Sequence, residues 1–275
     1  MAAKDIRGLA DELRNLLVRI DDIPSNTPKV AMRKLRADLE TAAIDLRSRL
    51  NALDPVSQPP AFFDPADPRL FGTFAAVALL GQERVPLSQR AGQRFYGSGV
   101  YAIYYSGDFD LYAPISQTET PIYVGKADPA VRAARTPQQQ GPQLSSRLEE
   151  HRKNIERATN LSVGHFQCRY LPIASGWQAV TESSLIALFN PLWNKEMKVL
   201  LGFGKHGDSA ETRKNRRSPW DVLHQGRKWA GAEALEDAKS IERIEADVAS
   251  HFSKHRPIGT IDEVLQILLQ HVGAA

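Results

Sequence analysis

The feature that most constrains this chain is the order of its patterned segments in the middle third. Residues 100–105 and 121–125 are short runs rich in β-branched and aromatic side chains, which favour strands. A helical pattern at 144–155, a third strand-like run at 166–171 and an amphipathic helix at 178–189 follow. This order predicts an α/β (α+β) fold, in which helices flank a small, mostly antiparallel sheet of three strands.

The segments on either side of this core have patterns of their own. Residues 1–54 carry apolar side chains at helical spacing around a proline-flanked break, which predicts an antiparallel helical hairpin. The apolar stripe of this hairpin faces either the rest of the chain or a second subunit. Residues 55–96 are expected to form a proline-rich connector and a short helix at 71–80. We assign 97–195 to the core, and 196–275 to a basic loop and helices packed on that core.

Composition excludes several classes of protein. No apolar run approaches the roughly 20 residues that span a bilayer. The N-terminus lacks the continuous apolar segment of a secretory signal. The single cysteine, Cys168, cannot form an internal disulfide, and no Cys-x-x-Cys pair is available for zinc. We therefore expect a cytoplasmic protein with no membrane partner.

Charge is concentrated in one stretch of the C-terminal third. The whole chain has a formal net charge of only +3. Residues 205–228 hold seven Lys or Arg against three acids, a local net charge of 7 − 3 = +4. Such a run is either a solvated loop or a surface that faces phosphates.

Six polar side chains follow one another through the core. A Gly-Val-Tyr triplet ends at Tyr101, and a Tyr-Val-Gly triplet begins at Tyr123. Arg147 and His151 are four residues apart on a predicted helix, so they share one face. Taken singly, such residues are ordinary core aromatics, surface charges or helix caps. The full series is Tyr101, Tyr123, Arg147, His151, Glu182 and Asn194.

Together, these motifs closely resemble the GIY-YIG nuclease superfamily over roughly residues 97–195, with Val in place of Ile in both triplets. The runs FYGSGVYAIYYSGDFDLYAPI, PIYVGKA, GFGKHG and SPWDVLHQGRKW are similar to its type II restriction endonucleases, in particular those that read CCGCGG. The resemblance implies hydrolysis of both strands of double-stranded DNA at a GC-rich palindrome. Cutting a palindrome implies a homodimer with two active sites. No small-molecule cofactor is expected.

Phosphodiester hydrolysis needs an activated water and neutralisation of charge at the phosphate. Glu182 is the one carboxylate of the series, so we expect it to hold a Mg²⁺ ion, for which Mn²⁺ substitutes. The sequence offers no second acid at a matching position, which indicates one ion per site. Arg147 has a planar guanidinium suited to the scissile phosphate.

The general base has two candidates. The resemblance places the hydroxyl of Tyr101 beside the attacking water, but an ordinary tyrosine pKa of about 10 makes a poor base unless Lys126, His151 or the ion favours the phenolate. Histidine titrates near neutrality and is the simpler base. We favour a relay in which Tyr101 touches the water and His151 accepts or tunes the proton. Tyr123 would position the phosphate or Tyr101, and Asn194 would orient substrate or metal ligands.

Once a nuclease core is expected, the basic run favours DNA contact. The candidate DNA-binding residues are Arg213, Lys214, Arg216, Arg217, Trp220, Arg227 and Lys228. Two alternatives to a restriction enzyme stay open. One is a GIY-YIG enzyme that nicks a single strand, as in repair or homing. The other is a DNA-binding protein with an inactive nuclease core.

Overall fold

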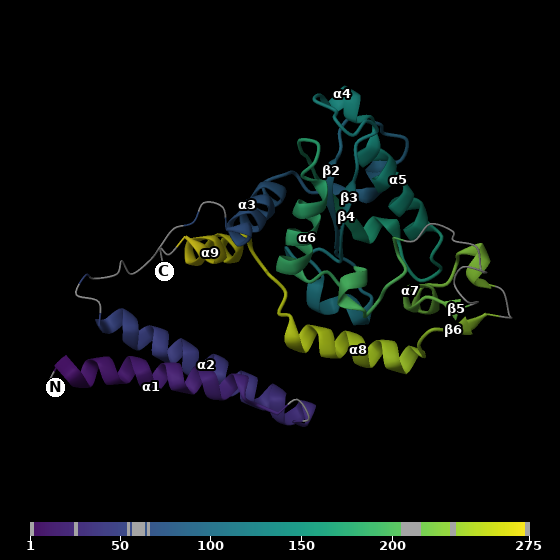
Figure 1. The fold of residues 1–275 in the computed structure, drawn as a ribbon. Coiled ribbons are helices and arrows are strands. Elements are labelled where there is room, and N and C mark those ends of the chain that lie inside the picture. Colours follow the sequence, from purple (N-terminus) through teal and green to yellow (C-terminus); the bar gives the residue numbers. More distant parts are fainter. Residues whose placement is uncertain are drawn as a thin grey trace. The chain divides into compact units, whose positions relative to one another are not determined.

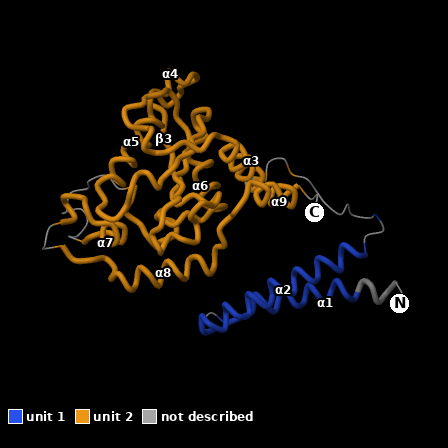
Figure 2. The backbone as a smooth tube through the Cα atoms, turned by 180° about the vertical axis from the view of Figure 1, so that it is seen from behind, with its two compact units in different colours: residues 1–62 blue, residues 63–275 orange. Residues whose placement is uncertain are grey.

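The computed structural model describes residues 3–24, 27–53, 56, 64, 67–204, 216–231 and 235–272. The chain divides into two compact units, Met1–Phe62 and Phe63–Ala275 (Figure 2). The division falls within the proline-rich connector. The nuclease-like motifs therefore all belong to the second unit.

The first unit is a hairpin of two long helices, α1 (Ala3–Asp21) and α2 (Lys29–Leu53). The turn between them is closed by Thr27, whose amide and hydroxyl both donate to the carbonyl of Pro24. None of residues 8–24 and 27–53 is buried. The periodicity of the sequence thus predicts the helices, and the hairpin has no closed core of its own.

The second unit mixes helices and strands (Figure 1). Its α-helices and strands are α3 (Pro68–Leu80), β1 (Val85–Pro86), β2 (Gly99–Tyr105), β3 (Tyr123–Ala127), α4 (Pro137–Gln140), α5 (Gln143–Glu156), β4 (Phe166–Pro172), α6 (Gln178–Phe189), β5 (Arg216–Arg217), α7 (Pro219–Leu223), β6 (Glu236–Asp237), α8 (Ile241–Lys254) and α9 (Ile261–His271).

The main sheet is antiparallel and has the strand order β1-β4-β2-β3. The prediction of three strands was wrong by one, because β1 adds a fourth strand. This strand pairs Val85 with Cys168 and Pro86 with Gln167. Two residues are too few to produce an alternating pattern in the sequence. Strands β5 and β6 form a separate parallel pair, also of two residues each.

Strand β2 is buried along its whole length, which explains its continuous apolar sequence. Tyr101, Ile103 and Tyr105 join the core cluster that includes Leu148 of α5. Val100, Ala102 and Tyr104 point to the opposite face, into the cluster formed with α3 and α6. Figure 1 shows α5 and α6 on opposite sides of the sheet. The sheet is therefore sandwiched between helices, and β3 is its edge strand on the side of the signature triplets.

The helices beyond the sheet close its two cores. Helix α6 has the predicted bounds and ends at Asn190, which adopts a left-handed conformation before Pro191. Helix α8 begins at residue 241, where the side chain of Ser240 caps it. Ile244 and Val248 of α8 belong to the same cluster as Tyr101. No described helix is both long and apolar enough to cross a membrane.

Candidate active site

The two signature triplets lie next to each other in the sheet. Tyr101 of β2 is opposite Gly125 of β3, and a Cβ atom at Gly125 would collide with the Tyr101 hydroxyl group. Gly99 is constrained in the same way, because a Cβ there would collide with the carbonyl oxygen of Leu171 on β4. Gly125 thus allows the Tyr101 side chain to lie across the edge strand, and Gly99 allows the backbones of β2 and β4 to approach closely.

Tyr101 and His151 form a buried pair. The Tyr101 hydroxyl oxygen lies 2.6 Å from Nε2 of His151 on α5, and both side chains are fully buried. The His151 ring stacks on Phe203 with ring centroids 4.7 Å apart. Burial raises the pKa of Tyr101 well above 10, and the nearby Tyr123 adds to this effect. Tyr101 is therefore a neutral phenol at neutral pH, with its hydroxyl bound to an imidazole.

Arg147 lies one helical turn before His151 and brings positive charge to the tyrosines. Its charge lowers the pKa of Tyr101 and of Tyr123, opposing the larger effect of burial. Burial still raises the pKa of Tyr123 to about 12. The Arg147 side chain is 30% exposed, with Nη1 2.8 Å from Oε2 of Glu150. A partly exposed guanidinium beside two neutral phenols can reach an anionic substrate.

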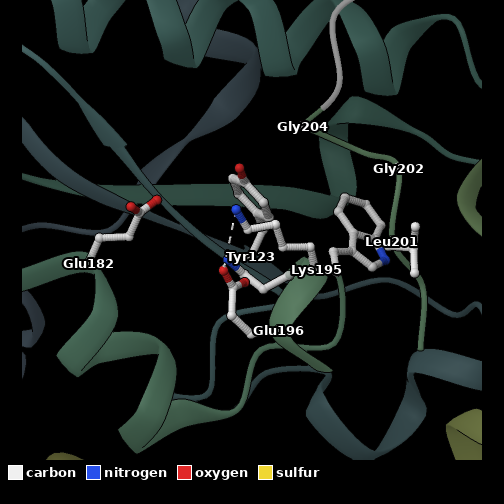
Figure 3. Close-up of a pocket in the computed structure, with 9 residues that line it drawn as sticks. Tyr123, Glu182, Lys195, Glu196, Leu201, Gly202 and Gly204 are labelled. Atoms are coloured by element: carbon white, nitrogen blue, oxygen red, sulfur yellow. Dashed lines mark ion pairs between the residues drawn. The ribbon is translucent and has the colours of Figure 1, made fainter. Parts of the chain in front are cut away.

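A cavity of about 240 Å³ opens beside β3 and contains the expected metal ligand. Figure 3 shows Glu182 entering from α6 and Tyr123 from β3. Burial raises the pKa of the Glu182 carboxyl group, while the positive charge of Lys126 lowers it. Lys126, which pairs with Asp128, is therefore within electrostatic reach of the cavity.

Asn194 lines this cavity, but its amide contacts the protein backbone. Its Oδ1 accepts from the amide of Val124 at 2.9 Å, and its Nδ2 donates to the carbonyl of Val124 at 2.8 Å. These two hydrogen bonds position β3, and the contact of Asn194 with substrate or metal ligands stays a prediction. The strand held in this way carries Tyr123 and Lys126.

A second carboxylate, not expected from the sequence, lies in the cavity. Glu196 lies in the 3₁₀ turn η4 (Lys195–Met197) and lines the cavity with Glu182 (Figure 3). Lys195 Nζ lies 3.8 Å from Oε1 of Glu196. Glu196 is therefore a second acid near the metal site that the sequence pattern did not predict. The only signal in the sequence is that Glu196 comes two residues after Asn194.

These side chains fit a hard divalent cation. The donors lining the cavity are the carboxylates of Glu182 and Glu196 and the hydroxyl of Tyr123, all oxygen ligands. Within the described part of the chain, no three His, Cys, Asp or Glu side chains form a closed metal cluster. Mg²⁺ often binds through one or two carboxylates and completes its shell with water and substrate phosphate. Glu182, the more buried of the two acids, is the better candidate to hold it.

The basic run is divided between surface and interior. Arg213 and Lys214 lie outside the described residues. Arg216 and Arg217 form β5 and pair with Glu236 and Asp237, while Lys228 is exposed. Seven residues were predicted to contact DNA. Among those that the structure describes, Arg216, Arg217 and Lys228 are at least partly exposed.

Trp220 and Arg227 lie in the core, which corrects their predicted DNA-facing position. Trp220 is fully buried, and the Arg227 guanidinium lies 4.4 Å from the centroid of its ring. Arg227 donates to the carbonyls of Gly202 and Phe203 at 3.0 and 2.7 Å. It also pairs with the buried Asp221. These contacts hold the backbone that forms one wall of the cavity, because Gly202 lines it.

Comparison with known proteins agrees with this geometry. A family model described as the Eco29kI GIY-YIG domain matches residues 93–252, more than half of the chain. The match includes every predicted catalytic residue and continues past 195 through the basic run. No curated protein matches the chain. The chain belongs to the Eco29kI GIY-YIG domain family, a family of restriction endonucleases within the GIY-YIG superfamily, and is a nuclease of that type.

Proposed function

We propose that this protein is a type II restriction endonuclease that hydrolyses both strands of double-stranded DNA at a GC-rich palindrome, with CCGCGG as the first site to test. The observation that carries the proposal is the Tyr101–His151 pair with Arg147 one helical turn away, next to the cavity that Glu182 lines. Membership of a restriction endonuclease family supports the same activity.

The side chains suggest a division of roles around one phosphodiester. Arg147 binds the scissile phosphate through its planar guanidinium. Burial keeps Tyr101 neutral, so its hydroxyl orients the attacking water and does not act as a free phenolate. As the water loses a proton to the Tyr101 oxygen, Tyr101 passes its own proton to Nε2 of His151, 2.6 Å away. Tyr123, on the strand that Asn194 positions, lines the cavity, and Lys126 of the same strand adds positive charge near Glu182.

The metal requirement belongs to the same proposal. Glu182 holds one Mg²⁺ ion per site, and Mn²⁺ substitutes for it. The ion supplies charge neutralisation at the phosphate and at the departing 3′ oxygen. We propose Glu182 as the ligand because it is the more buried of the two cavity carboxylates. The role of Glu196 is then to modulate the charge of the cavity, and it is not a required ligand.

We also propose that Arg216, Arg217 and Lys228, with Arg213 and Lys214, form the DNA-binding surface. Recognition of a palindrome requires a homodimer, because each strand needs an active site of its own. No organic cofactor or membrane partner is part of the reaction, and the bacterial cytoplasm is its expected compartment.

Digestion of supercoiled plasmid with the purified full-length protein tests this function. With Mg²⁺ present, the proposal predicts linear DNA whose sequenced ends all derive from one palindrome, and no cleavage with EDTA. Open circles alone would favour the single-strand nicking alternative. Binding of DNA without cleavage under any divalent ion would favour the inactive DNA-binding alternative.

A further inference from the structure

Arg227 places a buried positive charge beside the candidate active site. Its side chain is 5% exposed, and its Nη1 lies 3.3 Å from Oδ1 of Asp221, whose side chain is fully buried. A buried ion pair of this kind contributes little net stability, because the cost of removing both charges from water offsets their attraction. The position of this pair in the second unit is therefore better explained by what the guanidinium holds.

The guanidinium of Arg227 holds the backbone on both sides of one aromatic residue, Phe203. Its Nη1 donates to the carbonyl of Gly202 at 3.0 Å, and its Nη2 donates to the carbonyl of Phe203 at 2.7 Å. These carbonyls belong to the two peptide planes that flank the Cα atom of Phe203. Holding both planes sets the backbone dihedral angles of Phe203, and with them the direction in which its ring points.

The ring of Phe203 lies nearly flat against the imidazole of His151. The two ring centroids are 4.7 Å apart, and the planes are inclined by 20°. A stacked neighbour restricts rotation of the imidazole about its Cβ–Cγ bond, the motion that would turn Nε2 away from the Tyr101 hydroxyl. Phe203 thus limits His151 to the orientation in which its Nε2 lies 2.6 Å from that hydroxyl oxygen.

The segment that carries Arg227 also contacts the end of α5, the helix of His151. A Cβ atom at residue 226 would overlap the carbonyl oxygen of Arg157, the residue that caps α5. Gly226 has a φ of 141°, and its lack of a side chain lets the two backbones approach this closely. One segment therefore contacts both the helix that carries His151 and the backbone that carries Phe203.

We propose that Arg227 is a positioning residue for the proton-transfer step. It holds the ring of Phe203 against His151, and the stacked imidazole keeps its Nε2 aligned with the Tyr101 hydroxyl. The inference rests on the proposed function, because it assumes that a proton passes between Tyr101 and His151. Arg227 contacts neither the water nor the phosphate in this step. Its loss should therefore slow the chemical step and leave DNA binding unchanged.

The test neutralises the buried pair as a unit in the full-length protein. Arg227→Gln with Asp221→Asn removes both charges, so no uncompensated charge is left in the core. The control, Arg169→Gln with Glu119→Gln, removes a similar pair on the other face of the sheet, where Arg169 also donates to a backbone carbonyl and lies over a tyrosine ring. Circular dichroism gives the folded fraction of each variant.

Single-turnover cleavage of supercoiled plasmid with Mg²⁺, at increasing enzyme concentration, separates the maximal rate from the half-saturating concentration. Arg227→Gln/Asp221→Asn should lower the maximal rate by about 10²-fold, the cost of misplacing a reacting group by about 1 Å, with an unchanged half-saturating concentration. Phe203→Leu should act in the same way, because it removes the stacked ring. Arg227→Lys should lose less, because it keeps the charge but lacks the planar fork. The control pair should cleave at the wild-type rate.

A Tyr101→Phe background distinguishes a positioning role from a structural one. Neutralising the Arg227 pair should have little further effect there, because the step that it supports is already lost. An equal fold-loss in both backgrounds, or the same loss in the control, would overturn the inference. A fully active Tyr101→Phe variant would contradict the proposed relay itself. A slow Tyr101→Phe variant beside a fully active Arg227→Gln/Asp221→Asn variant would contradict this inference alone.

Discussion

The hydroxyl oxygen of Tyr101 lies 2.6 Å from Nε2 of His151, inside the core between β2 and α5. A second pair of the same kind, Tyr112 and His224, lies in the same core with a separation of 2.5 Å between the same atoms. Only the first pair is associated with Arg147 and Glu182, whose charges act on Tyr101. We therefore propose a catalytic role for the first pair and a structural role for the second.

Removing the Tyr101 hydroxyl should abolish most of the activity. We expect Tyr101→Phe and His151→Ala each to lower the cleavage rate by about 10²–10⁴-fold, the usual contribution of a positioned proton-transfer group. Tyr112→Phe is the matched control: it removes the same hydrogen bond elsewhere and should affect stability but not the rate per folded molecule. Single-turnover cleavage of a DNA duplex measures these rates. A fully active Tyr101→Phe variant would exclude Tyr101 from proton transfer.

Arg147 should be required for its shape as well as its charge. Arg147→Ala is expected to lower kcat by about 10²–10³-fold, as for loss of one aimed donor to developing charge. Arg147→Lys should restore only part of the lost kcat, because lysine lacks the planar guanidinium group that can form two parallel hydrogen bonds. Arg152, on the same helix, pairs with Glu149 and Glu156, so Arg152→Ala should leave kcat unchanged. Equal rates for the Arg147→Ala and Arg152→Ala variants would contradict the role of Arg147.

Asn194 should act through the strand that it holds. Asn194→Ala removes both hydrogen bonds to Val124 and leaves two buried backbone groups unsatisfied, which costs about 1–3 kcal/mol of unfolding free energy per group. Asn194→Asp keeps the acceptor but sets a carboxylate oxygen against the Val124 carbonyl, so it should destabilise the protein as well. Urea denaturation measures both. Wild-type stability of both variants would contradict this positioning role.

His224 should make the protein sensitive to mild acid. Burial lowers its pKa to about 3, against 6.5 for an ordinary histidine. The unfolded chain therefore binds a proton that the folded chain does not, and this contribution to stability falls as pH decreases from about 6.5 towards 3. Urea titrations between pH 4 and pH 7 should show that the free energy of unfolding decreases as the pH falls. The decrease per pH unit should be smaller for His224→Gln than for the wild-type protein. An identical pH dependence of the free energy of unfolding in the two proteins would contradict the lowered pKa of His224.

The sequence could predict those helices and strands whose conformation is determined by neighbouring residues in the chain. Helix α6 was predicted with its observed bounds, because Leu185, Ile186 and Phe189 share one side and Pro191 prevents the helix from continuing. The two-residue strand β1 gave no period to detect. This difference arises where strand pairing, and not periodicity, decides the structure.

In the candidate site, too, the sequence could not predict positions that depend on contacts between distant parts of the chain. Glu196 reaches the cavity because the chain turns after Asn194, and no local pattern encodes that turn. Trp220 and Arg227 were assigned to DNA because an aromatic residue in a basic run looks the same whether it is exposed or buried. Tertiary contacts place Arg227 in the interior, because its guanidinium donates to the carbonyls of Gly202 and Phe203.

The two carboxylates of the cavity provide the most direct test of the metal site. Glu182→Gln removes the charge that would hold the ion, whereas Glu196→Gln is the matched change in the same cavity. Because burial raises the pKa of Glu182 and disfavours its ionised form, the neutral amide should not destabilise the metal-free protein at neutral pH. The variants can therefore be compared as folded proteins.

Mg²⁺-dependent cleavage of plasmid by these two variants is the decisive measurement. The account predicts that Glu182→Gln lowers the cleavage rate by at least about 10³-fold at every Mg²⁺ concentration, while Glu196→Gln stays within about tenfold of the wild-type rate. Wild-type cleavage by Glu182→Gln, under conditions where EDTA stops the wild-type enzyme, would contradict the claim that Glu182 holds the catalytic cation.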